Sequence, residues 1–334
     1  MRSPSLDTGL GVVVIGRNEG ARLISCLRSI ARALPGVRVV YVDSNSTDAS
    51  VAAARSLHAD VVELDGRKPF TAAWARNTGW RRLVEIAPGA TRVHFLDGDC
   101  ELIDGWLDAA MSFLDERPDV GVVCGRRRER FPNATIFNAQ CDVEWNTAIG
   151  QARSCGGDAL MRIDALCAVG GYNESLIAGE EPELCVRIRA NGRKVWRLDR
   201  DMVWHDAAMT RWLQWWRRTK RAGHAFAEGA ALHGHAPERH YVAERRRALI
   251  WGMLLPLLII VAGMVDAHAF WLALIYPIQV TRLALRPSAA VRQAGIAWSR
   301  AFLLVAGRFA EAAGVTLYVW RRMRGHASTL IEYK

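Results

Sequence analysis

The chain has 334 residues and a mass of 37.1 kDa, and 51% of its residues are hydrophobic while 23% are charged, which excludes a disordered protein. Its seven cysteines include no CxxC pair, and no apolar stretch follows Met1, so we expect reduced thiols facing the cytosol and not a disulfide-stapled secreted module. The net charge of +10 lies in the last third, because residues 1–210 carry a net −2 and residues 211–334 carry +12. Such a basic segment favours nucleic acid or an anionic membrane surface as a partner.

The first two hundred residues alternate between short β-branched runs and helical stretches. Strands are expected at 11–15, 37–42, 60–64, 92–96 and 120–124, and helices near 19–33, 47–57 and 70–86. This alternation predicts an α/β fold with a doubly wound, mostly parallel sheet whose ligands bind outside the carboxyl ends of the strands. Neither GxGxxG nor GxxxxGK[ST] occurs, which argues against a dinucleotide oxidoreductase and a P-loop enzyme.

Acidic residues stand at the ends of two of these strands. Asp43 ends the second strand, and Asp97 and Asp99 follow the fourth with Gly98 between them. Two carboxylates aimed into one crevice suit Mg²⁺ or Mn²⁺, which would neutralise a diphosphate. An isolated Asp-x-Asp is also typical of a solvated turn, so the pair alone does not decide between these interpretations.

Two charge-free runs follow in the last third, at 248–265 and 267–281, separated only by Asp266. As a helix the first run is about 27 Å long, which is close to the thickness of a bilayer. The runs lie between Arg245–Arg247 on one side and arginines at 282, 286 and 292 on the other. The positive-inside rule therefore predicts a transmembrane hairpin over about 248–281 with both ends in the cytosol.

A third apolar stretch, at 296–320, has a different pattern. Arg300, Arg308 and Glu311 fall within about 80° of one another around a helix, which is typical of an amphipathic helix lying in the membrane interface. A buried helical core would explain neither the arginine clusters nor their positions. We expect a catalytic domain over residues 1–235 and a membrane-attachment region over 236–334, and we expect no nucleic-acid partner.

An ordered set of motifs resembles family 2 of the inverting glycosyltransferases, which have the Rossmann-like GT-A fold. The motifs are Asn18-Glu19, Asp43-Ser-Asn-Ser-Thr-Asp48, Ala75-Arg-Asn77, Asp97-Gly-Asp99, Gly170-Gly-Tyr-Asn-Glu174 and Gly179-Glu-Glu-Pro-Glu-Leu184. The resemblance covers residues 10 to about 220, and the apolar tail makes the membrane-attached exopolysaccharide enzymes, including those of succinoglycan assembly, the most similar group. It implies a metal-dependent hexosyltransferase that uses Mg²⁺ or Mn²⁺ and a nucleotide diphosphate sugar, UDP-linked donors being the first expectation.

The resemblance assigns donor-side roles residue by residue. Glu19 and Asp43 match positions that hold the base and ribose of uridine, and Arg76 matches an arginine that meets the nucleotide. Asp97 and Asp99 match the metal ligands, with Asp97 also facing the donor. His205 matches a histidine that approaches the metal or the diphosphate in many relatives, although a lone histidine is more often structural.

Acceptor-side roles come from two further motifs. The segment Gly156-Gly-Asp-Ala-Leu-Met-Arg162 resembles the acceptor wall, where Asp158 contacts an acceptor hydroxyl or holds a turn. Glu181 occupies the position of the general base, where aspartate is usual, and its neighbour Glu180 is assigned to acceptor binding. Acidic residues also suit the N-terminus of a helix that begins near Pro182, which is a purely structural alternative.

A last motif lies in the tryptophan-rich segment before the apolar runs. Gln214-Trp-Trp-Arg217-Arg218 resembles the Gln-x-x-Arg-Trp motif of membrane sugar polymerases, with arginine in place of the final tryptophan. Gln214 and Arg217 are therefore expected on the acceptor side, while the departure at Arg218 argues against processive synthesis. Tryptophan and arginine are equally typical of docking at a membrane interface.

Together these features predict an inverting glycosyltransferase of bacterial-type cell-surface polysaccharide synthesis. It would lie at the inner membrane with its catalytic domain in the cytosol and pass the sugar to a lipid-linked or saccharide acceptor. Two alternatives stay open. One is a polyprenyl-phosphate glycosyltransferase, whose anionic acceptor needs no base, and the other is a non-catalytic membrane scaffold that retains the fold.

Overall fold

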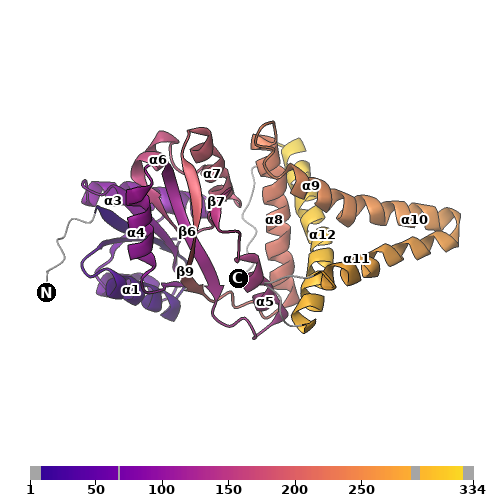
Figure 1. Cartoon of the computed structure of the whole chain (residues 1–334), viewed down its shortest axis with the longest axis horizontal. Coiled ribbons are helices and arrows are strands. Elements are labelled where there is room, and N and C mark those ends of the chain that lie inside the picture. Colours follow the sequence, from indigo (N-terminus) through magenta and orange to yellow (C-terminus); the bar gives the residue numbers. More distant parts are fainter. Residues whose placement is uncertain (1–8, 67, 287–293, 326–334) are drawn as a thin grey trace. The chain divides into compact units, whose positions relative to one another are not determined.

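The computed structural model describes residues 9–66, 68–286 and 294–325 (Figure 1). Arg292, which belongs to the predicted flanking arginines, lies outside these ranges. The chain divides into two compact units, of which the first comprises Met1–Arg130 and Trp145–Asp206 and the second Phe131–Glu144 and Ala207–Lys334. The domain boundary expected near residue 235 stays a prediction.

The first unit is built on a nine-stranded mixed sheet in the order β3-β2-β1-β4-β8-β6-β9-β5, with β7 paired to β9. The longer ladders, β1 with β2 and β4 and β6 with β9, are parallel, whereas β8 is antiparallel to β4 and β6. The strands are β1 (Leu10–Gly16), β2 (Arg38–Asp43), β3 (Asp60–Glu63), β4 (Arg92–Asp97), β5 (Cys100–Leu102), β6 (Val120–Glu129), β7 (Gly150–Ala152), β8 (Ala159–Arg162) and β9 (Lys194–His205). The predicted α/β fold class is confirmed.

Helices cover this sheet because its central strands are apolar on both faces. Val12, Val13 and Val14 in β1 are fully buried. Helix α3 lies directly against β1, where a Cβ on Gly79 would come within 2.3 Å of Val13 Cγ1. The helices of this unit are α1 (Ala21–Ala33), α2 (Ser50–Ser56), α3 (Ala72–Ile86), α4 (Trp106–Glu116), α6 (Ile163–Ala168) and α7 (Glu180–Ala190).

The secondary-structure elements among the described residues of the second unit are all helices. It contains α5 (Ile136–Glu144), α8 (Trp212–His233), α9 (Val242–Leu249), the π-helix η1 (Ile250–Leu254), α10 (Leu255–Val265), the 3-10 helix η2 (Ala267–Leu274), α11 (Ile275–Ala284) and α12 (Ala294–Met323). Glycines bring α8 and α12 together, since a Cβ on Gly223 would lie 2.1 Å from the Glu311 carbonyl oxygen and one on Gly314 2.0 Å from the Lys220 carbonyl oxygen.

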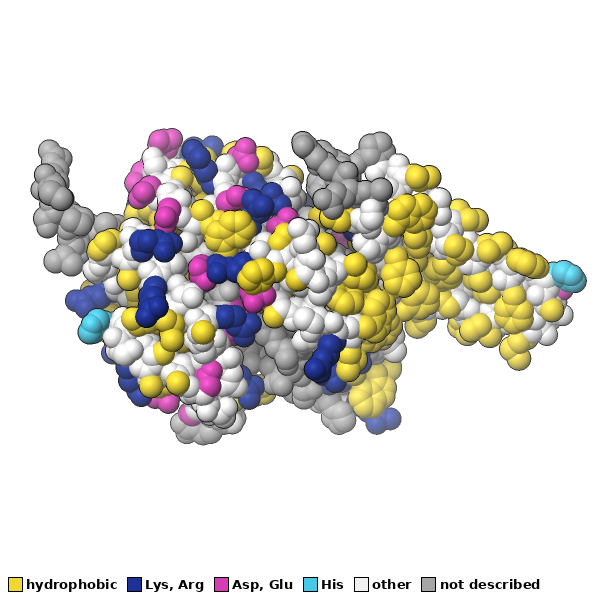
Figure 2. All heavy atoms as spheres, turned by 90° about the horizontal axis from the view of Figure 1, so that it is seen from below, with side chains coloured by type: hydrophobic (Ala, Val, Ile, Leu, Met, Phe, Trp, Pro, Cys, Tyr) yellow, Lys and Arg dark blue, Asp and Glu magenta, His cyan; other side chains and the backbone are white. Residues whose placement is uncertain are grey.

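Segment 250–284 forms a helical hairpin that turns at Asp266 (Figure 1). Hydrophobic side chains gather over it, as Figure 2 shows, and Val265 and Trp271 are 88% and 70% exposed. Among the described residues, Val242–Val265 and Gly295–Met323 are helices long and apolar enough to cross a membrane. The second leg of the hairpin, η2 and α11, does not meet that standard, and an interfacial position for α12 stays a prediction.

Candidate active site

The candidate site lies at the carboxyl end of β4, where Asp97 ends the strand and Gly98 turns the chain toward β5. The Gly98 N–H donates to the Ile15 carbonyl of the neighbouring β1 at 2.8 Å. A Cβ on Gly98 would lie 3.1 Å from that oxygen and 3.3 Å from Glu19 Cγ. Glycine thus lets the turn pack closely against β1 and Glu19, which fixes the directions of the two flanking aspartates.

Two arginines hold Asp97. Arg76, on α3, donates from Nη2 to Asp97 Oδ1 at 2.8 Å, and Arg127, on β6, donates from Nη2 to Asp97 Oδ2 at 3.0 Å. Burial opposes ionisation of Asp97, but the two guanidinium groups hold its pKa below its usual range. Asp97 is therefore a carboxylate in a cationic setting, and a diphosphate would meet two arginines at this place.

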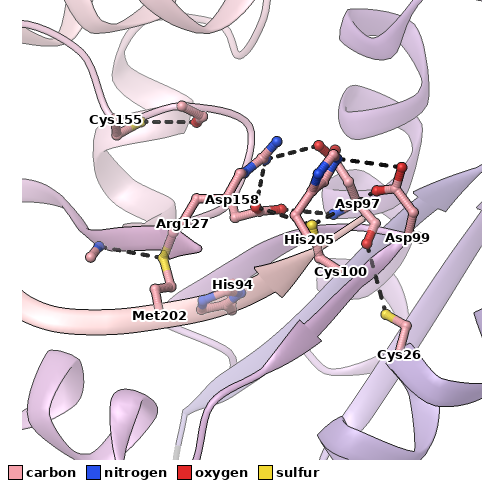
Figure 3. A network of polar contacts seen from close by, with 12 residues as sticks. Cys26, His94, Asp97, Asp99, Cys100, Arg127, Cys155, Asp158, Met202 and His205 are labelled. Atoms are coloured by element: carbon pink, nitrogen blue, oxygen red, sulfur yellow. Dashed lines mark hydrogen bonds and ion pairs between the residues drawn. The ribbon is translucent and has the colours of Figure 1, made fainter. Parts of the chain in front are cut away.

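Asp158 contacts both Arg127 and Asp97. Figure 3 shows Asp97, Arg127, Asp158 and His205 pointing toward one another. Asp158 is completely buried, 2.5 Å from Arg127 Nη2, and it accepts from the Asp97 N–H at 2.9 Å. Burial raises the pKa of Asp158, against the attraction of Arg127. These contacts favour a role in positioning Arg127 and the Asp97 turn, and the acceptor contact expected for Asp158 stays a prediction.

Asp99 and His205 form a second pair of side chains close to Asp97. His205 ends β9, opposite Cys100 in the antiparallel ladder, and its Nε2 lies 3.5 Å from Asp99 Oδ2 (Figure 3). Its Nδ1 lies 3.9 Å from Glu129 Oε2, and the Trp145 ring meets the imidazole edge to face at 4.8 Å. Burial disfavours the imidazolium, yet Asp99 and Glu129 raise the pKa of His205 above its usual range.

This donor set suits a divalent cation. Two ligands of one ion lie about 3 Å apart when each is about 2.1 Å from it, so small movements would let Asp99 and His205 share an ion. Four carboxyl groups, on Asp97, Asp99, Asp158 and Glu180, converge here with two guanidinium groups. Carboxyl groups thus outnumber guanidinium groups here, and a divalent cation would offset the excess of negative charge.

The two adjacent glutamates of α7 point to different partners. Glu180 Oε1 accepts from Arg76 Nη1 at 2.9 Å, so this residue joins the Asp97 network through the arginine. Glu181 is 5% exposed, and its Oε1 accepts from the Cys155 N–H at 2.6 Å and from the thiols of Cys155 and Cys185 at 3.0 and 3.1 Å. The two glutamates at the N-terminus of α7 thus have separate partners, an arginine for Glu180 and the Cys155 N–H and two thiols for Glu181.

Asp43 and Glu19, the two residues predicted to hold the nucleoside, have polar partners of their own. Asp43, at the end of β2, is buried and accepts from Tyr41 Oη at 2.9 Å and from Ser46 N and Oγ at 2.7 and 2.5 Å. Glu19 pairs with Arg22 at 2.8 Å. Their contact with a nucleotide stays a prediction.

Gln214 and Arg217 belong to α8, in the second compact unit. Gln214 Oε1 accepts from the N–H groups of Thr210 and Arg211 at 3.0 Å each and so caps the helix, while Arg217 is exposed. Their contact with an acceptor stays a prediction.

Sequence reasoning missed Arg127 and Glu129 because the fifth strand was expected to end at 124. In the structure β6 continues to Glu129, and Arg127 and Glu129 are two residues apart in its regular final part, so they point to one face of the sheet.

Comparisons with known proteins agree with this architecture. Residues 11–165 match the sequence model of Glycosyl transferase family 2. The Succinoglycan biosynthesis protein ExoA of Rhizobium meliloti (strain 1021) is 27% identical over 224 residues, which are 62% of this chain and 67% of that protein.

Two solved structures resemble the whole chain. One is the mannosyltransferase PcManGT of Pyrobaculum calidifontis, in complex with GDP-Man and Mn²⁺, with a TM-score of 0.59, 21% identity and coverage of 94% of this chain and 87% of that one. The other is residues 1–349 of TarS from S. aureus, with a TM-score of 0.51, 13% identity and coverage of 95% and 92%. The fold is therefore GT-A-like, as predicted.

Proposed function

For a chain that carries a glycosyltransferase family 2 domain and acts as a glycosyltransferase of polysaccharide synthesis, we propose that the site at the carboxyl end of β4 transfers a sugar with inversion. The donor is a nucleotide diphosphate sugar bound with Mg²⁺ or Mn²⁺, and the acceptor is lipid-linked or a saccharide. The observation that carries the proposal is the placement of Asp97 between Arg76 and Arg127, with Asp99 and His205 next to it. The GDP-Man and Mn²⁺ bound to the similar mannosyltransferase support this choice of donor class and metal.

Asp97, Asp99 and His205 would hold the metal ion, which supplies positive charge where the departing diphosphate becomes more negative. Arg76 and Arg127 provide the remaining cationic contacts, because a guanidinium group that binds Asp97 keeps further N–H donors for phosphate oxygens. Asp158 keeps Arg127 in place from its buried side. Glu19 and Asp43 would hold the base and the ribose, since Glu19 follows β1 by three residues and Asp43 ends the neighbouring strand β2.

Glu181 would remove the proton from the acceptor hydroxyl, and Glu180 would position that acceptor. Loss of a general base costs about 10²–10⁴-fold in rate. Glu181→Gln should therefore slow transfer by this factor while donor affinity stays near that of the wild type. Glu180→Gln should instead weaken donor binding, because it releases Arg76 from its contact at 2.9 Å. The reverse pattern would make Glu180 the base.

The apolar helices support a membrane-attached enzyme, and we place it at the inner membrane with the catalytic unit in the cytosol. A polyprenyl-linked acceptor then lies in the same layer as the enzyme. Gln214 and Arg217 are proposed to contact this acceptor. A polyprenyl-phosphate acceptor is the second candidate, and a Glu181→Gln variant that retains most of its activity would favour it, because a phosphate needs no base.

The test is transfer of labelled sugar from UDP- and GDP-linked donors to membrane lipid extracts, with Mn²⁺ or with a chelator. Asp99→Asn removes an anionic ligand while keeping the size of the side chain, and it should abolish most turnover and weaken Mn²⁺-supported donor binding. Asp104→Asn is the matched control, since the Asp104 side chain is 75% exposed and pairs with Arg32 at the surface. Activity that survives the chelator, or an Asp99→Asn variant equal to the control, would refute the metal assignment. Failure of every donor to bind would favour a non-catalytic scaffold.

A further inference from the structure

Two thiols and a carboxylate meet at the start of α7, away from the Asp97 network. Cys155 precedes the acceptor-wall glycines, and Cys185 lies one helical turn after Glu181 on α7. The two Sγ atoms are 3.7 Å apart, and Glu181 Oε1 lies 3.0 Å from one and 3.1 Å from the other. We call Cys155, Glu181 and Cys185 the thiol cluster.

The charge of the thiol cluster is unbalanced. Glu181 is 5% exposed, and in the described ranges no cationic side chain forms an ion pair with it. Its carboxylate accepts from an N–H group and two thiols, all of them neutral donors. A buried carboxylate without a counter-charge is costly, so a cation bound at this place would be stabilising.

We propose that the thiol cluster is a second metal site, which binds a soft divalent cation of the zinc class. Zinc bound to two thiolates at about 2.3 Å in tetrahedral geometry places the sulfurs about 3.8 Å apart, close to the distance of 3.7 Å between the two Sγ atoms. The oxygen would need to move by about 0.5 Å to reach its tetrahedral separation from each sulfur. Three protein ligands leave a fourth position for water or another ligand.

Ligand chemistry separates this site from the one at Asp97 and Asp99. Thiolates select zinc and related soft ions, whereas carboxylates and water suit Mg²⁺ and Mn²⁺. Burial raises the pKa of the Cys155 thiol, so metal binding must release protons and should weaken as the pH falls. Under the proposed function, the bound ion would occupy the carboxylate that serves as the base, so zinc would inhibit transfer and leave donor binding unchanged.

The direct test is Co²⁺ binding to the full-length chain in detergent, with thiols kept reduced by a phosphine. Cobalt bound to thiolate gives a charge-transfer band in the near ultraviolet, and Zn²⁺ displaces it. Cys155→Ser should weaken binding by more than about 10-fold, since even an outer-shell partner is worth ~10–100-fold in metal affinity. Cys167→Ser is the matched control, because Cys167 is exposed and is not part of the thiol cluster. Asp99→Asn should leave the cobalt band unchanged.

Cys185→Ser and Glu181→Gln should weaken Co²⁺ binding in the same way, and Mn²⁺ in excess should not displace the ion. No thiolate band in the wild type, or a band that survives Cys155→Ser, would overturn the proposal. Inhibition by zinc is measured separately, as a transfer rate with saturating donor and Mn²⁺. If transfer is absent without zinc, the proposed function fails while the metal site still stands on its spectrum.

Discussion

Gly157 offers the sharpest test of the arginine–aspartate network. A Cβ at this position would lie 2.7 Å from Arg76 Nη2, 3.0 Å from Asp97 Oδ2 and 3.3 Å from Arg127 Nη2. Atoms in contact prefer a separation of roughly 3.5 Å, so Gly157→Ala requires Arg76 to move by about 0.8 Å. Arg76 is 3% exposed and tied to both Asp97 and Glu180, so it cannot swing into solvent.

The size of the effect follows from the contact that is lost. Moving Nη2 by this amount takes the bond to Asp97 from 2.8 Å to beyond hydrogen-bonding range. A hydrogen bond to a charged group is worth about 1.5–3 kcal/mol, and overpacking of a buried site costs about 1–3 kcal/mol. We expect Gly157→Ala to lower both the unfolding midpoint and, by about 10- to 100-fold, the affinity for the donor.

Calorimetry with a nucleotide sugar and Mn²⁺ measures the affinity, and thermal unfolding measures the stability. Gly66→Ala is the control, because the nearest atom to a Cβ there is Phe70 Cζ at 3.9 Å, an ordinary contact. If Gly157→Ala binds the donor and unfolds as the wild type does, the arginine network is not the rigid binding element that its contacts indicate.

Two further predictions concern stability. Burial lowers the pKa of His94 to about 3, so this side chain stays neutral in the folded protein. In the unfolded chain the same side chain takes up a proton below about pH 6.5. The free energy of unfolding should therefore fall as the pH falls, by about 2 kcal/mol at pH 5 relative to pH 8. Urea unfolding at several pH values checks this, and His94→Gln should remove that part of the pH dependence. Gly314→Val should separate α8 from α12, since even a Cβ at this position would lie 2.0 Å from the Lys220 carbonyl oxygen. Limited proteolysis should then cut α8 faster than in the control variant Gly295→Ala, where a Cβ meets nothing within 4 Å.

The positions of the aspartates at the strand ends were predictable because local patterns determine where parallel strands end. The β-branched runs placed β1 and β4 within one residue of their ends, and the carboxyl ends of neighbouring parallel strands meet at one edge. Arg127 and Glu129 were not found, because three consecutive arginines interrupt the apolar run that marked the strand. Their place depends on pairing with β9, where Glu129 stands opposite His205, and no local pattern shows that pairing.

The sequence predicted where the apolar segments of the membrane region lie, but not the type of helix that each segment forms. The first apolar run is a helix over nearly all its length, with a π-turn at Ile250–Leu254. The second was expected as one leg of a hairpin, yet it begins as the 3-10 helix η2 before α11 starts at Ile275. In α12, the polar stripe does form a contact, since Arg308 pairs with Glu311 at 2.7 Å. A charge count shows that a segment is apolar and does not show which helical type it adopts.

The assignment of Glu180 and Glu181 depends on a difference of one residue. Neighbours on a helix point about 100° apart, so only one of them can face a given partner. Glu180 accepts a hydrogen bond from Arg76, whereas Glu181 accepts from the thiols of Cys155 and Cys185. Because the two sets of partners are separate, a change at the thiols reaches Glu181 and leaves the Arg76–Asp97 contact intact. The same sequence motif therefore joins one glutamate to the Arg76–Asp97 contacts and leaves the other open to whatever binds the thiols.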